Sequence, residues 1–313
     1  MSLISFLKEP DVKKRFRQEF KKPKLAKEKN QIAPPQSGRY SLIGTAFDYL
    51  LRFYLQCLNA NAIRWRWVAE DAVNYLIKMK EEEIDPSTWL IQITERVSSI
   101  FSRAWIEHER YLSSGEITDS LLGSTLCLAQ LDVVIRNPLV IHGGAFAETL
   151  GVVHPEDVRD LRNLISAVGS ERFRAENICL LNPAFGEASG LVGGADADLL
   201  IDDVLIDIKT TMYFKLERAY FNQLIGYFIL HEIAGIGDLE PKPKISKVAI
   251  YFSRYAHLET FKLSDVIDTK TFPDLVNWFS KRAEQYRQEI CEGFYQHATR
   301  VTDINFLLNR LRS

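Results

Sequence analysis

Apolar residues in the first half of the chain recur at helical spacing, three or four positions apart. This spacing predicts a helix over 41–58. Pro155 and the two acids after it open another well-marked helix, because proline suits the first helical turn and acids favour its positive end. Further helices are expected near 65–80, 87–112, 118–136 and 143–150. The stretch of about 60–150 is therefore predicted to be a helical insertion or subdomain.

The pattern becomes extended after Gly169, where short apolar runs are separated by turn residues. The expected strands are 178–181, 191–201, 204–211, 246–253 and 258–263. A helix is predicted over 216–234, and the tail over 273–311 is expected to be largely helical. This mixture places the chain in the α/β (α+β) class.

The two apolar runs on either side of Asp202-Asp203 predict a β-hairpin, because this dipeptide favours a turn. A turn centred there pairs Ile201 with Val204, and further out it sets Asp198 opposite Asp207 and Asp196 opposite Lys209. Side chains alternate across a strand, so each face can be written down. One face is apolar and carries Ala197, Leu199, Ile201, Val204, Ile206 and Ile208. The other carries Asp196, Asp198, Asp207 and Lys209, with Leu200 and Leu205 near the turn.

The acidic face of this hairpin indicates chemistry. Opposed carboxylates repel one another unless they share a proton or bind a cation. Oxygen ligands suit Mg²⁺ or Mn²⁺, and a lysine beside them can orient a water or stabilise an oxyanion. The alternative is an ordinary half-exposed hairpin with a polar outer face. Aspartate is depleted in strands, which favours the functional interpretation.

The bulk composition is that of a globular protein, with 46% hydrophobic and 26% charged residues among 313. We expect no membrane association, because no apolar run approaches the ~20 residues of a membrane span. We also expect no signal peptide, because Lys8, Glu9 and Asp11 interrupt the N-terminus before a long apolar region develops. The four cysteines lack a Cys-x-x-Cys spacing, so a zinc or iron–sulfur site has no support and a reducing cytoplasm is the expected compartment.

Charge is distributed unevenly along the chain. The net charge is −2, but residues 1–36 contain ten Lys and Arg against four Asp and Glu. We therefore divide off 1–38 as a basic N-terminal arm, which either contacts phosphates or is a solvated tail. The run 64–67, Arg-Trp-Arg-Trp, is a second candidate for phosphate contact, although core anchoring by the tryptophans is the favoured interpretation.

Gln223 and Tyr227 stand four positions apart in the helix predicted after the hairpin, so they share one helical face. By themselves they indicate no more than a buried tyrosine beside a partly buried glutamine. Their place after the hairpin changes that interpretation.

Together these motifs resemble the RecB-type branch of the PD-(D/E)XK nuclease superfamily. Asp198 matches the metal-binding aspartate of the family, and Asp207-Ile208-Lys209 matches its (D/E)-x-Lys. Gln223 and Tyr227 match its Gln-x-x-x-Tyr. The stretch 44–48, Gly-Thr-Ala-Phe-Asp, is similar to the Gly-x-x-x-His of that branch, with Asp48 in place of the metal-binding histidine.

The resemblance implies a restriction-endonuclease-like fold, in which helices flank a mixed central sheet. The resemblance covers roughly residues 39–56 and 175–255. Together with the residue patterns it leads us to expect a single nuclease domain over 39–313, with a helical insertion over about 60–150, a core over about 155–263 and a helical C-terminus. The metal ligands it implies, for Mg²⁺ or Mn²⁺, are Asp198, Asp207, the Ile208 carbonyl and Asp48. Lys209 would position the attacking water or stabilise the developing negative charge, and Gln223 and Tyr227 would support the site or contact substrate.

The function implied is metal-dependent hydrolysis of phosphodiester bonds in DNA. Settings typical of the family are antiviral defence and DNA repair, with a separate helicase or ATPase, or another defence-system protein, as partner. Two alternatives stay open. One is a catalytically inactive module of the same fold that binds nucleic acid or a protein, and the other is a metal-dependent hydrolase of a small phosphate ester.

Overall fold

The computed structural model describes residues 2–25, 29–142 and 144–290. In this part of the chain six strands form one mixed sheet, in the order in which they occur in the sequence. The strands are β1 (Ala62–Arg64), β2 (Cys179–Leu181), β3 (Leu199–Ile201), β4 (Val204–Lys209), β5 (Lys247–Phe252) and β6 (His257–Lys262).

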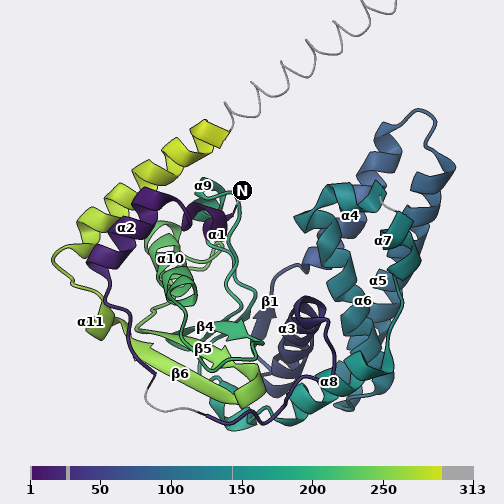
Figure 1. The fold of residues 1–313 in the computed structure, drawn as a ribbon, viewed down its shortest axis with the longest axis horizontal. Coiled ribbons are helices and arrows are strands. Elements are labelled where there is room, and N and C mark those ends of the chain that lie inside the picture. The colour runs from purple at the N-terminus through teal and green to yellow at the C-terminus, as the bar shows by residue number, and fades with distance from the viewer. Residues whose placement is uncertain (1, 26–28, 143, 291–313) are drawn as a thin grey trace, which may run out of the picture.

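Helices surround this sheet (Figure 1). The α-helices that precede β2 are α1 (Leu3–Phe6), α2 (Pro10–Glu19), α3 (Tyr40–Leu58), α4 (Val68–Glu82), α5 (Thr88–Ser114), α6 (Asp119–Arg136), α7 (Gly144–Thr149) and α8 (Pro155–Ser166). Those that follow it are α9 (Gly186–Leu191), α10 (Arg218–Ala234) and α11 (Leu263–Val266), and 272–290 is also helical. Short 3-10 helices are η1 (Pro138–His142), η2 (Ser170–Phe173) and η3 (Ser253–Tyr255).

The centre of the sheet is an antiparallel meander of β2, β3 and β4, followed by a crossover through α10 to β5. β5 lies parallel to β4, as a connection through a helix allows. The remaining neighbours are β1, parallel to β2, and β6, antiparallel to β5. The crossover places α10 directly over β4, so side chains from these two elements meet.

The sheet is the middle layer of the molecule and is buried on both faces. On one face Leu199 and Ile206 pack with α3, α8 and the helices α4–α6 in a first hydrophobic core. On the other face Leu200 and Leu205 pack with α1, α2, α10 and the helix over 272–290 in a second core. Strands covered on both faces are apolar along most of their length. The hairpin is therefore not the half-exposed element with a polar outer face that the sequence left open.

The basic N-terminal segment is packed onto this second core. Phe6 and Phe16 are fully buried, and the ring of Phe6 meets that of Phe279 edge to face, with centroids 5.1 Å apart. An ion pair of 2.7 Å joins Asp11 to Arg282 across the same contact. Figure 1 shows α2 alongside the helix over 272–290. Residues 3–20 thus belong to the folded body of the protein.

Most predicted elements are confirmed, with boundaries shifted by a few residues. The strand expected over 191–201 is wrong for most of its length, because α9 runs to Leu191 and only Leu199–Ile201 is strand. Gly193 and Gly194 between them have positive φ angles of 78° and 114°, which a strand does not allow. β1 was not predicted, since three residues are too short to show a period. The expected helix beyond 290 lies outside the described residues.

Within the ranges that the structure describes, no helix combines the length and apolar character needed to cross a membrane.

Candidate functional site

The predicted hairpin register is confirmed along β3 and β4. Leu199 pairs with Ile206, Leu200 with Leu205 and Ile201 with Val204. Asp202 turns the chain with a φ of 50°, a conformation that aspartate tolerates better than most residues. The apolar residues that face each other across the hairpin are those that the alternation predicted.

Before Leu199 the chain is not paired with β4; it pairs with the loop that precedes α9 instead. The Asn182 amide donates to the Asp198 carbonyl at 2.8 Å, and Asp196 forms an isolated bridge with Ala184. This change of partner turns Ala197 into the second core, away from Leu199, so its predicted place on the apolar face is wrong.

Asp198 keeps its contact with β4 through its side chain. Its Oδ2 accepts a hydrogen bond from the Ile208 amide at 2.5 Å. The carboxylate is therefore held beside Asp207, as the predicted pairing required, although the backbone ladder has already ended. Asp196 does not pair with Lys209, which was one of the arrangements that the register suggested, because Lys209 has Asp207 as its partner.

A chain of polar contacts runs from the end of β4 into α10. Lys209 Nζ lies 2.7 Å from Asp207 Oδ2 and donates to Gln223 Oε1 at 3.2 Å. Gln223 Nε2 in turn donates to the Tyr227 hydroxyl at 2.7 Å. Four of the predicted site residues are thus in one connected group, and α10 holds two of them at helical spacing.

Burial and neighbouring charge set the protonation of this group. Burial raises the pKa of Asp207 to about 7, and the charge of Asp198 adds to that effect against the opposing charge of Lys209. Burial by itself would lower the pKa of Lys209, but the charges of Asp207 and Asp198 outweigh it and raise that pKa. The site therefore holds Lys209 charged beside Asp207, whose pKa is raised to about 7.

α3 contributes Asp48 to the same region. Gly44 on this helix lies against Thr210, just past the end of β4, where an added Cβ would meet the threonine Cβ at 3.8 Å. Burial raises the pKa of Asp48 to about 7; the charge of Arg52 opposes this shift, and that of Asp198 adds to it. Asp48 and Asp207 therefore both experience the charge of Asp198, which places the three carboxylates in one electrostatic cluster.

Two residues of this cluster were not predicted from the sequence. Arg52 is one helical turn after Asp48, and its Nη2 lies 2.6 Å from Asp48 Oδ2. Asp132 on α6 accepts a hydrogen bond of 2.6 Å from the Tyr49 hydroxyl, and its charge also raises the pKa of Asp48. The spacing of Asp48 and Arg52 was a visible signal for an ion pair. Nothing local to Asp132 pointed to α3.

The donor set suits a divalent cation by its chemistry. Asp48 Oδ1 is buried without a hydrogen-bond partner, and Asp207 Oδ2 has only its ion pair with Lys209. Oxygen atoms of this kind are the ligands that Mg²⁺ and Mn²⁺ prefer. The described residues nonetheless contain no group of three or more His, Cys, Asp or Glu side chains arranged to hold a metal ion. Arg52 and Lys209 supply the positive charge among these carboxylates.

The run 64–67 serves the helical half of the molecule. Trp67 is 3% exposed, and the Arg64 guanidinium lies 5.1 Å from its ring centroid. The tryptophan is thus a core anchor, as the favoured interpretation held.

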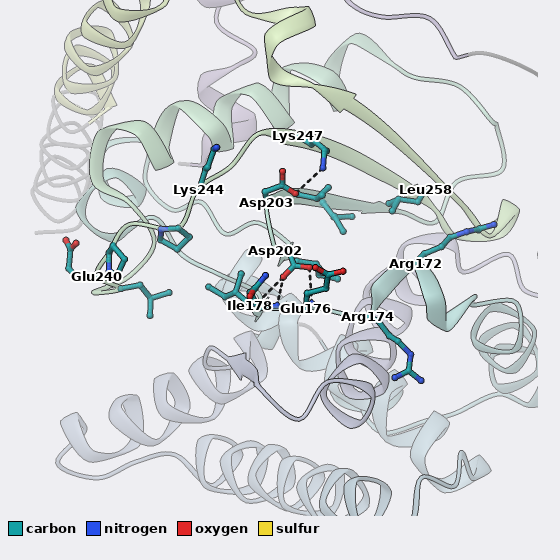
Figure 2. Close-up of a pocket in the computed structure, with 17 residues that line it drawn as sticks. Arg172, Arg174, Glu176, Ile178, Asp202, Asp203, Glu240, Lys244, Lys247 and Leu258 are labelled. Atoms are coloured by element: carbon teal, nitrogen blue, oxygen red, sulfur yellow. Dashed lines mark hydrogen bonds and ion pairs between the residues drawn. The ribbon is translucent and has the colours of Figure 1, made fainter.

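A pocket of about 1010 Å³ lies at the other end of the hairpin (Figure 2). Its charges balance, and Asp202 and Asp203 at the turn are occupied by hydrogen bonds to neighbouring backbone and side-chain groups. The charged side chains around it are Arg172, Arg174, Lys244, Lys247, Glu176, Asp202, Asp203 and Glu240. The length of β4, roughly 17 Å at ~3.3 Å per residue, separates this turn from Lys209. No predicted site residue lines the pocket.

No family model, no curated protein and no solved structure matches this chain. Inferences about its function therefore depend on the chemistry of the site described above.

Proposed function

We propose that this protein is a metal-dependent nuclease that hydrolyses phosphodiester bonds in DNA. The observation that carries the proposal is the buried group at the end of β4, where Asp207 and Lys209 are 2.7 Å apart beside Asp198. Burying an ion pair of this kind costs desolvation free energy. A contribution to stability alone is therefore a weak explanation for its presence. Carboxyls with strongly shifted pKa values that lie next to a charged lysine are typical of catalytic sites.

The order of elements around this group supports a restriction-endonuclease-like core. The strand with the (D/E)-x-Lys motif, β4, follows the Asp198 segment in a hairpin, and the next helix, α10, carries Gln223 and Tyr227. This helix connects β4 to the parallel strand β5, and Gln223 on it lies within hydrogen-bond distance of Lys209 at the end of β4.

Each residue has a proposed role. Asp198, Asp207, the Ile208 carbonyl and Asp48 would hold the cation. Bound Mg²⁺ or Mn²⁺ polarises a phosphate and lowers the pKa of a coordinated water.

Lys209 is held between Asp207 and Gln223, so its ammonium is positioned to orient a water or to stabilise charge on the phosphate. Gln223 and Tyr227 act as positioning residues, because they fix the lysine from α10.

One observation favours the inactive alternative, a module of the same fold that binds nucleic acid or a protein. Arg52 is only 7% exposed, pairs with Asp48, and interacts with the charge of Asp198. The Arg52 guanidinium neutralises part of the negative charge of these carboxylates, which would otherwise attract a cation. Metal binding therefore separates the two proposals.

The direct test is cleavage of linear and circular, single- and double-stranded DNA with Mg²⁺ or Mn²⁺. We expect Asp207→Asn and Lys209→Gln each to lower the cleavage rate at least about a hundredfold, because the first weakens the proposed metal site and the second removes the ammonium that stabilises charge on the phosphate. Asp238→Asn and Lys215→Gln make the same chemical changes at exposed positions outside the site and should cleave as the wild type does.

Titration calorimetry with Mn²⁺ gives the second measurement. Binding that disappears in Asp207→Asn supports the metal site. A wild-type protein that neither cleaves DNA nor binds Mn²⁺ would contradict the nuclease proposal and leave the inactive module.

A further inference from the structure

A pocket of about 460 Å³ opens beside Lys209, between the N-terminal segment and α10. Lys8, Lys13 and Arg17 line it from the N-terminal side, and Arg218 lines it from the start of α10. We call this the basic pocket. It contains Lys209 in its wall, so it is continuous with the candidate active site.

Charge in the basic pocket has one sign. Five cationic residues line it, and no acidic residue among those described does. Within the described part of the chain, Lys8, Lys13 and Arg17 have no ion pair. Burial and the charge of Arg17 lower the pKa of Arg218, so these two guanidinium groups are close enough to repel one another. A cleft with cations only concentrates anions from solution.

A second observation indicates a ligand that also donates a hydrogen bond. Asn222 lines the pocket and is 5% exposed, yet its Oδ1 has no hydrogen-bond partner. A buried polar atom without a partner costs free energy, which a ligand donor would recover. The remaining wall includes the half-buried ring of Tyr220 and Ile4, which is 48% exposed. This part of the wall is aromatic and apolar, and the Lys209 ammonium lies 5.0 Å from the centroid of the Tyr220 ring.

The N-terminal cations are presented by a fixed wall. Phe16 anchors α2 in the second core, and Arg218 Nη1 donates to the Phe20 carbonyl at 2.9 Å. Lys22 Nζ donates to the Leu216 carbonyl at 2.6 Å, just before α10. These contacts join the end of the segment to the start of α10, which excludes a freely solvated tail for residues 3–22.

We propose that the basic pocket binds one nucleotide of a single strand, next to the phosphodiester held at Lys209. Its phosphate would lie among Lys13, Arg17 and Arg218, and its base would stack on Tyr220. The inference rests on the proposed function, because it takes Lys209 as the group beside the reacting phosphate.

Three features select this ligand. Cations bind phosphate, aromatic rings stack on bases of any sequence, and 460 Å³ lies within the range of pockets for small ligands. Bases within a duplex are stacked on their neighbours, so a single strand is the form whose base can enter a pocket.

The test is binding of a fluorescein-labelled oligothymidylate to the full chain, followed by fluorescence anisotropy in EDTA. Lys13→Gln combined with Arg17→Gln should weaken binding on the order of tenfold and reduce the slope of log Kd against log salt by about 0.7. This is the change expected when the protein no longer neutralises one phosphate of a single strand. Lys14→Gln, next in sequence on the exposed surface of α2 and outside the pocket, should bind as the wild type does.

Stacking is tested separately with Tyr220→Ala and Tyr220→Phe. The alanine variant should bind about tenfold more weakly and the phenylalanine variant should retain the wild-type affinity, since a benzene ring still stacks. A fold defect would affect thermal melting, which is measured on each variant.

Two outcomes would overturn the inference. One is a Lys13/Arg17 double variant that binds the oligonucleotide as tightly as Lys14→Gln does. The other is a blunt duplex whose affinity falls in the double variant as much as that of the single strand. Because EDTA removes divalent ions, the assay is independent of cleavage. A protein that binds as expected but never cleaves DNA would refute the nuclease and not the pocket.

Discussion

Asp207 shows how one residue depends on its surroundings. In the sequence it is an acid two positions before a lysine. In the structure it is 1% exposed, paired with Lys209 and close to the charge of Asp198, and burial raises its pKa to about 7. Asp48 reaches about the same pKa through burial on a different element, α3. The site therefore has two carboxyls, Asp48 and Asp207, that change protonation near neutral pH, whereas ordinary surface acids are ionised there.

We expect the raised pKa of Asp207 to appear in the pH dependence of stability. Its folded pKa lies above that of the unfolded chain, so between about pH 4 and pH 7 the folded protein keeps a proton that the unfolded chain has released. Asp207 therefore makes the free energy of unfolding decrease as the pH rises through this window, by on the order of 4 kcal/mol.

Urea unfolding at intervals between pH 4 and pH 8 measures this contribution. Asp207→Asn should flatten the decline, and Asp238→Asn, an exposed acid outside the site, should leave it unchanged. If the decline in Asp207→Asn equals that of the wild type, Asp207 titrates outside this window and the assignment is wrong.

At the scale of elements, the N-terminal segment combines two roles. One side of α1 and α2 is apolar and packs against α10 and the helix over 272–290. Next to this apolar side, α2 presents Lys13 and Arg17 to the basic pocket. The same helix thus contributes to stability through Phe16 and to anion attraction through its cations.

Phe16→Ala should lower the free energy of unfolding by about 3–5 kcal/mol, because it removes a fully buried ring and leaves a cavity. Lys14→Gln on the same helix should change it by less than about 0.5 kcal/mol. Chemical denaturation of both variants measures the difference. Equal stability of Phe16→Ala and the wild type would mean that the segment is detached from the core in solution.

At the scale of the whole molecule, one sheet separates two hydrophobic cores. Each strand side chain at the centre of the sheet belongs to one core or the other, as Leu205 and Ile206 show. The candidate site lies where elements from both sides meet, since Asp48 comes from the first-core side and Gln223 from the second.

We therefore expect the two cores to unfold together. Four of the five tryptophans lie between 65 and 105, so tryptophan fluorescence reports mainly on the helical half. Its thermal transition should coincide with that from far-UV circular dichroism. Phe16→Ala, in the other core, should lower the midpoint temperature of both transitions by about 5–10 °C. Two separate transitions would contradict a shared sheet.

Local patterns in the sequence determined most of the elements and part of the site. Helical periodicity predicted α3 and α10, and the Asp202-Asp203 turn predicted the register from Leu199 to Ile206. Helical spacing also placed Gln223 and Tyr227 on one face, where they are hydrogen-bonded. These features depend on residues a few positions apart, which is why the chain alone reveals them.

Only the tertiary structure decided how these parts meet. Asp198 leaves the ladder because the loop before α9 competes for its backbone. Asp132 reaches Tyr49 across 83 positions of sequence, and the N-terminal cations reach the candidate site because Phe16 is buried beside α10. Such contacts join residues that are distant in the chain. Burial and distant charges, which raise the pKa of Asp48 and Asp207, exist only once the chain has folded.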